Sequence, residues 1–157
     1  MVSMVIKKAE KLLSAENRDP NLMLKDVVEL LHTEKPNWDW VGIYVLDGEV
    51  LRLGPYIGHP TEHVAIRSGD GVCGTAVKEN SNQIIEDVSS LDNYIACSVG
   101  TRSEIVVLIK EGEEILGQFD IDSDEVGAFN KADEELLEQL SIMVSPWVKE
   151  YKKIMHG

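Results

Sequence analysis

Apolar side chains recur at helical spacing at the N-terminal end of the chain. In residues 1–15 they predict an amphipathic helix with an inner face of Val5, Ala9, Leu12 and Leu13. A second helix is predicted from residue 20 or 21 to about residue 33, with Asn21 as its candidate cap. Pro36 then ends the helical pattern.

The C-terminal part of the chain predicts one long helix, from residue 130 to about residue 153. Asn130 stands three residues before Asp133, which is the spacing of a capping pair at a helix start. The face expected to be buried carries Leu136, Leu137, Leu140, Val144 and Val148. Pro146 lies inside this pattern and predicts a kink.

Between these helices, apolar runs predict strands joined by tight turns. Residues 38–46 and 50–56 flank Asp47-Gly48, which is a strong signal for a two-residue hairpin turn. Residues 104–110 and 115–122 predict a second hairpin around Glu111-Gly112-Glu113. Weaker extended segments at 62–66 and 82–87, and a short helix at 72–79, complete the pattern.

Helices that bracket a mostly antiparallel sheet indicate an α+β fold, here one domain over residues 1–157. The flanking helices are expected to cover one face of the sheet. The other face is left for a pocket, roofed by the long connections at 58–66 and 88–103. Connections of that length in a compact domain are more often functional than idle.

Composition narrows the setting of this domain. No apolar run approaches the length of about 18 residues that a membrane-spanning helix needs, and the N-terminus lacks a signal-peptide pattern. The formal net charge is −13 without a basic stripe, which argues against nucleic acid as a partner. Two cysteines in 157 residues indicate a reducing, cytoplasmic setting, where a disulfide between them would be catalytic or regulatory.

The two cysteines are the candidate reactive groups. Cys73 lies in a glycine-rich loop that opens into the short helix, and Cys97 lies among small residues before an apolar strand. Helix N-termini and loops of small residues can lower the pKa of a thiol and leave it accessible. The alternative is that both cysteines are inert, small hydrophobic residues.

Other candidate residues also have two interpretations. Asp120 and Asp122 share one face of their strand, which borders either solvent or a wet pocket. The three tryptophans, Trp38, Trp40 and Trp147, are as readily core residues as ligand contacts. We expect no metal and no cofactor, because the histidines at 59 and 63 lie in a loop and the cysteines lack ligand spacing.

A family resemblance rests on six segments distributed over residues 38–133. They are Trp40-Val41-Gly42-Ile43-Tyr44, Leu53-Gly54-Pro55-Tyr56, Gly71-Val72-Cys73-Gly74-Thr75-Ala76, Ile95-Ala96-Cys97, Arg102-Ser103-Glu104-Ile105-Val106 and Asp120-Ile121-Asp122-Ser123. Together they resemble the GAF-domain free methionine-(R)-sulfoxide reductases. The resemblance implies a GAF fold with a six-stranded antiparallel sheet and a closed pocket for one small amino acid.

The same resemblance implies a thiol mechanism. Cys97 would attack the sulfoxide sulfur of free L-methionine (R)-sulfoxide and become a sulfenic acid, which a second cysteine condenses to a disulfide. A thioredoxin-type dithiol would then reduce that disulfide. Glu104 is expected to act as the acid or to bind the sulfoxide oxygen, and Asp120 and Asp122 to bind the amine, although these roles can be exchanged. The aromatic wall for the S-methyl end is assigned to Trp40 and Tyr56.

The chain departs from the family pattern at His63, where many relatives carry an additional, often resolving, cysteine. It therefore resembles a two-cysteine variant in which Cys73 resolves Cys97, unless a rigidly held Cys73 leaves that role to an external thiol. A non-catalytic GAF module that senses a small ligand is the alternative function, and a simple thiol redox switch is a minor third one. The terminal helices are candidate elements of a homodimer interface, with a simple cover for one face of the sheet as the alternative, and the sequence does not assign the oligomeric state or the physiological reductant.

Overall fold

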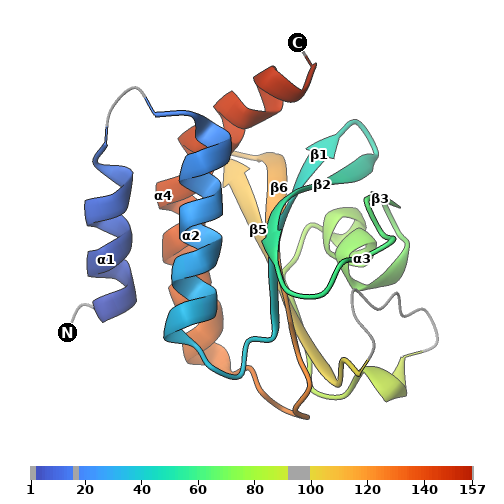
Figure 1. Ribbon diagram of the computed structural model, residues 1–157. Helices are drawn as coiled ribbons and strands as arrows, with labels where there is room; N and C mark the ends of the chain where they lie inside the picture. The colour runs from blue at the N-terminus through green and yellow to red at the C-terminus, as the bar shows by residue number, and fades with distance from the viewer. Residues whose placement is uncertain (1–2, 16–17, 92–99, 157) are drawn as a thin grey trace.

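The computed structural model describes residues 3–15, 18–91 and 100–156, and a six-stranded antiparallel sheet lies at its centre (Figure 1). The strand order across the sheet is β3-β2-β1-β6-β5-β4. The strands are β1 (Trp40–Asp47), β2 (Val50–Ile57), β3 (Ala65–Arg67), β4 (Gln83–Ile85), β5 (Ser103–Glu111) and β6 (Glu114–Ser123). The helices are α1 (Met4–Leu13), α2 (Pro20–Glu34), α3 (Gly71–Glu79), the 3-10 turn η1 (Val88–Ser90) and α4 (Lys131–His156). The predicted α+β class and the six-stranded antiparallel sheet are confirmed.

Two hairpins account for four of the six strands. Gly48 and Gly112 occupy their turns with φ angles of 63° and 60°, a region that glycine enters without steric cost. The β1–β2 and β5–β6 hairpins then pair side by side through β1 and β6. Both predicted hairpins are therefore present, and their junction forms the middle of the sheet.

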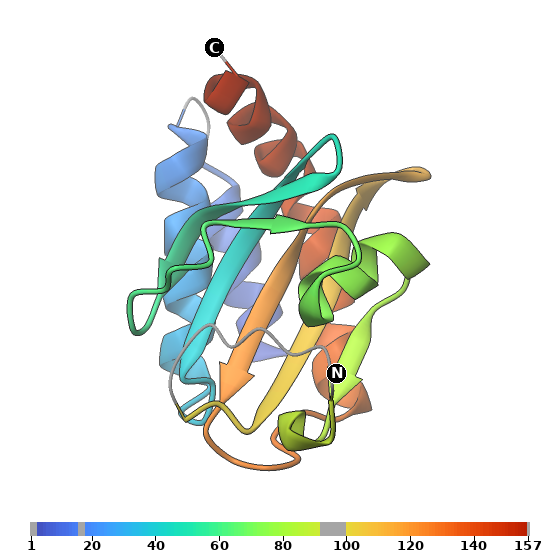
Figure 2. The same cartoon turned by 90° about the vertical axis from the view of Figure 1, so that its right-hand side faces the viewer.

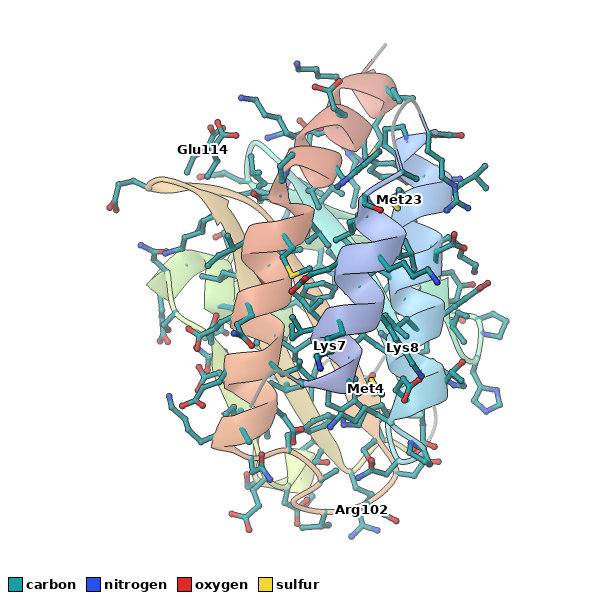
Figure 3. All side chains as sticks on the ribbon, turned by 90° about the vertical axis from the view of Figure 1, so that its left-hand side faces the viewer. Met4, Lys7, Lys8, Met23, Arg102 and Glu114 are labelled. Atoms are coloured by element: carbon teal, nitrogen blue, oxygen red, sulfur yellow. The ribbon has the colours of Figure 1, made fainter. Side chains whose placement is uncertain are left out.

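Helices α1, α2 and α4 cover one face of the sheet (Figure 1), and Figure 3 shows α1 on the outer side of this layer, against α2 and α4. Apolar side chains from these helices pack with those of β1, β5 and β6 into the larger of two core clusters. The start of α4 is capped as predicted, since Asn130 and Asp133 each bond the backbone N–H of the other at 3.0 Å. The helix continues through Pro146, and its C-terminal part leans away from its first part in Figure 1.

The cap of α2 differs from the prediction. Asp19, not Asn21, is the N-cap residue, and its carboxylate accepts a hydrogen bond from the backbone N–H of Asn21 at 3.0 Å. Pro20 occupies the first turn, where its missing N–H costs nothing. Within the described ranges, no helix combines the length and the apolar character needed to cross a membrane.

Among the described residues, α3 and the loops around it lie on the opposite face of the sheet, as Figure 2 shows with α3 in green in front of the strands. A second, smaller core cluster lies there, built around Trp40, Tyr44 and Cys73. The edge strands β3 and β4 have three residues each and are shorter than the predicted segments. Beyond β4, the side chain of Asn82 accepts a hydrogen bond from the backbone N–H of Leu108 at 2.8 Å, in place of a strand partner.

Candidate active site

Strand register gathers three carboxylates on the face that the large helices leave open. Glu104 of β5 lies directly opposite Asp122 of β6, and Asp120 lies two residues along on the same face. The three side chains are almost fully inaccessible to solvent, with exposed fractions of 1%, 1% and 0%. The polar face predicted from the alternation of Asp120 and Asp122 is therefore buried and does not face solvent.

Close packing of these acids changes the chemistry of Glu104. Burial raises the pKa of this carboxyl well above its ordinary value, and the neighbouring charges of Asp120 and Asp122 raise it further. The protonated form of Glu104 is therefore favoured. Such a group can deliver a proton to a reacting atom beside it.

The Cys73 side chain reaches this acidic cluster from α3. Cys73 lies in the first turn of the helix, where Gly71 starts with a φ of 62°. Its Sγ lies 3.9 Å from Oε2 of Glu104, and the residue is 3% exposed. The structure thus brings together Cys73, Glu104, Asp120 and Asp122, which the sequence separates widely.

A glutamine that the sequence analysis did not single out fixes the backbone of Cys73. Gln118 is fully buried on β6, and its Nε2 donates a hydrogen bond to the Cys73 carbonyl at 3.2 Å. It shares the face of Asp120 and Asp122 because strand side chains alternate with a period of two residues. The alternation of Asp122 and Asp120 continues two residues toward the N-terminus to Gln118, and this pattern in the sequence would have identified the glutamine.

An aromatic group borders the carboxylates. The buried Trp40 ring stacks on Tyr56 with 5.4 Å between ring centroids, and the Tyr44 ring centroid lies 6.4 Å from that of Trp40. The Trp40 ring lies over Gly42, which pairs with Asp120 across the two strands. Trp40 and Tyr56 are thus neighbours, as a wall would require, and Tyr44 is a third member that the sequence analysis did not assign.

Tyr56 is only partly buried, and a lysine of the helix layer contacts its backbone. Lys25 of α2 donates a hydrogen bond from Nζ to the Tyr56 carbonyl at 2.8 Å. Both residues also line a surface groove between α2, β2 and the end of α4. This contact connects the helix layer to the aromatic group.

The loop that follows β2 is fastened to the same aromatic residues. Trp40 Nε1 donates to the His59 carbonyl at 3.0 Å, and the Tyr44 hydroxyl donates to the His63 carbonyl at 2.7 Å. The backbone N–H of His63 in turn donates to the Thr61 side chain at 3.0 Å. This segment therefore lies against the aromatic group, which agrees with the predicted roof, while His63 contributes its backbone to these contacts.

The remaining candidate residues separate into two cases. Trp38 is a core residue on the helix-covered face, with its ring centroid 5.7 Å from that of Phe129, and Trp147 packs against the same core. Both are therefore core residues and not ligand contacts, which was one of their two interpretations. Cys97 lies outside the described residues, so its position and its pairing with Cys73 stay predictions.

Comparison with known proteins identifies relatives of this arrangement. The family model described as GAF domain matches residues 17–141. The free methionine-R-sulfoxide reductase of Escherichia coli is 42% identical over 117 residues, which cover 74% of this chain and 70% of the relative. The family-model match spans β5 and β6, the strands that carry the carboxylates.

Solved structures agree with the sequence matches. The type II free methionine-R-sulfoxide reductase from Thermoplasma acidophilum superposes with a TM-score of 0.81 and 39% identity, covering 83% of this chain and 93% of its own. The free methionine-R-sulfoxide reductase from Neisseria meningitidis, solved in complex with its substrate, gives a TM-score of 0.86 at 28% identity over 96% and 89% of the two chains. Family model, sequence and structure together place this chain in the GAF-domain family of free methionine-(R)-sulfoxide reductases.

Proposed function

We propose that this protein reduces free L-methionine (R)-sulfoxide to methionine. The observation that carries the proposal is the buried cluster of Glu104, Asp120 and Asp122, with the Cys73 sulfur 3.9 Å from Glu104 and an aromatic group beside it. Its relatives, named free methionine-R-sulfoxide reductases, support the same activity.

The cluster suits both ends of the substrate. Asp120 and Asp122 provide negative charge for the ammonium group, which would offset the cost of burying these carboxylates. Trp40 and Tyr56 provide a stacked aromatic surface for the S-methyl end, where sulfur and aromatic rings contact favourably. A site that requires a charged amine favours the free amino acid over a methionine sulfoxide within a peptide, because the peptide nitrogen carries no charge.

The chemistry requires two electrons and one proton transfer to the departing oxygen. The Cys97 thiolate attacks the sulfoxide sulfur, Glu104 protonates the oxygen, and that oxygen ends on Cys97 as a sulfenic acid while methionine leaves. The proton of Glu104 is restored by the proton that the Cys97 thiol gave up. The favoured protonated state of Glu104 supports its role as this acid.

Regeneration then requires a second thiol. The Cys73 thiol attacks the Cys97 sulfenic acid, a disulfide forms and water leaves. A thioredoxin-type dithiol reduces the disulfide and is itself oxidised to a disulfide. The resolving role of Cys73, in the first turn of α3, requires its Cα and that of Cys97 to lie within about 7 Å of each other when the disulfide forms.

Turnover by the purified, reduced protein tests the proposal directly. We expect loss of free methionine (R)-sulfoxide with dithiothreitol as reductant, no loss of the (S) epimer, and no reaction in Cys97→Ser. A methionine-sulfoxide peptide should not react. Binding of the amino acid without turnover by the wild type would contradict the proposal and favour a GAF sensor, and peroxide-driven disulfide formation without epimer preference would favour a simple redox switch.

Mass spectrometry after one turnover tests the resolving step. Alkylation of the quenched protein should show Cys73 linked to Cys97. Oxidised Cys97 with an alkylated Cys73 would contradict the resolving role and assign regeneration to an external thiol.

The same proposal includes a cellular setting and an assembly. A thiol cycle that ends in dithiol reduction requires a reducing compartment, which supports the cytoplasm.

Exposed Met4 and Ile142, on α1 and α4 of the helix layer, favour a homodimer through these helices (Figure 3). Sedimentation equilibrium should then give twice the chain mass, and a monomer at all concentrations would contradict the dimer.

A further inference from the structure

The Cys73 side chain and two of the carboxylates are arranged as ligands for a metal ion. One ligand atom each from Cys73, Glu104 and Asp120 lies within 4.8 Å of the others, and all three residues are buried. A tetrahedral zinc ion holds sulfur at about 2.3 Å and carboxylate oxygen at about 2.0–2.2 Å, so its ligand atoms stand roughly 3.5 Å apart. The three side chains would need to close by about 1 Å, which rotamer adjustment can supply.

Glu104 provides an independent reason to expect a cation. Its side chain is 1% exposed, and among the described residues no N–H or hydroxyl group donates to Oε1. No Lys or Arg in this part of the chain forms an ion pair with it, and the charges that act on it, Asp120 and Asp122, are negative. A buried polar atom without a hydrogen-bond partner is costly, and a coordinated metal ion would compensate it in place of the proton that Glu104 otherwise holds.

We propose that Cys73, Glu104 and Asp120 bind a thiophilic divalent cation, Zn²⁺ in the cell, with one coordination position open. Binding would replace the proton of the Cys73 thiol, which is released to solvent, by a sulfur–metal bond, and no electrons are exchanged. The mixture of one thiolate with two carboxylates favours zinc over magnesium or calcium, which prefer oxygen ligands alone.

The consequence is a reversible block of the cluster. A cation there neutralises the carboxylates and holds the Cys73 sulfur, so neither remains available to an incoming ammonium group or to Cys97. This second statement rests on the proposed reductase function, whereas cation binding itself does not.

Cobalt titration of the reduced, chelator-treated full-length protein tests the site without substrate. Bound Co²⁺ should produce a thiolate-to-metal charge-transfer band that saturates at one ion per chain and disappears when Zn²⁺ is added. The band should persist in Cys97→Ser, which retains the proposed ligand, and vanish in Cys73→Ser. A band that is lost in Cys97→Ser and kept in Cys73→Ser would overturn the proposal, as would its absence from the wild type.

Carboxylate variants keep the test decisive where Cys73→Ser fails to fold. Glu104→Gln and Asp120→Asn retain the sulfur but remove one charged ligand each, so the band should remain while the dissociation constant for Co²⁺ rises at least tenfold. Glu113→Gln, at an exposed turn, should leave the constant unchanged. Equal affinities in all four proteins would place the metal elsewhere and contradict the site, whatever the outcome of the turnover assay.

Discussion

The indole of Trp40 occupies the space above Gly42, so closely that a Cβ on Gly42 would stand 2.5 Å from Cη2 of the ring. Any side chain at position 42 therefore displaces the ring, and with it the stack on Tyr56. The absence of a side chain at this strand position is what permits the aromatic group to lie beside Asp120.

Gly42→Ala is expected to weaken substrate binding. Because the ring has to move, we expect KM to rise about tenfold to a hundredfold, the range that misplacement of a contact group by about 1 Å can cause. Steady-state kinetics with free methionine (R)-sulfoxide measures this. The neighbouring Val41→Ala, on the opposite face, should lower stability and leave KM near its original value. Similar KM changes in both variants would contradict the assignment.

Tyr44→Phe removes the hydroxyl that fastens the loop after β2 to the sheet. The variant loses the bond to the His63 carbonyl, whose net contribution to stability is about 1 kcal/mol. Hydrogen exchange in residues 58–64 should accelerate, and KM should rise more than kcat falls. Unchanged exchange in this loop would show that the Tyr44 hydroxyl does not secure it.

Gln118→Leu keeps the volume of the side chain but removes the side-chain donor to the Cys73 carbonyl, which retains only its bond within α3. We expect the free energy of unfolding to fall by about 1 kcal/mol, the usual net contribution of one hydrogen bond. The first turnover should proceed, while later turnovers slow because Cys73 is less well placed to resolve Cys97. A burst experiment with and without reductant separates the two steps.

Gln83→Leu, at a glutamine on the surface, is the control for Gln118→Leu. Gln83→Leu removes exposed, weaker hydrogen bonds and should change neither stability nor the later turnovers. Equal slowing of the first and later turnovers in Gln118→Leu would indicate a general disturbance of the site and contradict a positioning role.

Glu104 makes stability depend on pH in a defined direction. Its pKa is raised in the folded protein above the ordinary value of 4.5, so the folded state holds more protons than the unfolded state as pH rises past that value. The free energy of unfolding should therefore fall as pH increases from about 4.5, with a slope of up to about 1.4 kcal/mol per pH unit, until Glu104 ionises in the folded protein.

Glu104→Gln should remove this contribution, because glutamine does not titrate. Denaturant unfolding between acid and neutral pH measures the difference, and the exposed Glu113→Gln should retain the wild-type slope. Parallel pH profiles for the wild type and Glu104→Gln would contradict the raised pKa of Glu104.

Local signals in the sequence predicted the elements well and the site in part. The Asp47-Gly48 turn and the Asn130–Asp133 pair act within a few residues, so both could be recognised directly. Strand alternation likewise placed Asp120 and Asp122 on one face, though not whether that face is buried. The approach of Cys73 to Glu104 depends on how α3 packs against the sheet, a long-range relationship that spacing alone does not encode.

The same distinction explains the residues that were missed. Tyr44 was assigned to a strand, but its hydrogen-bond acceptor is a backbone carbonyl 19 residues away. Gln118 contacts a carbonyl 45 residues away. Backbone partners carry no sequence signature, because every residue has the same carbonyl group.

The two margins of the sheet have a consequence for how the chain behaves at high concentration. β3 and β4 have only three residues each. Beside β4, the side chain of Asn82 accepts the hydrogen bond of the Leu108 N–H on β5, in place of a strand partner. Edge-to-edge addition of another molecule would therefore find only brief runs of exposed backbone, a recognised safeguard against amyloid-like aggregation.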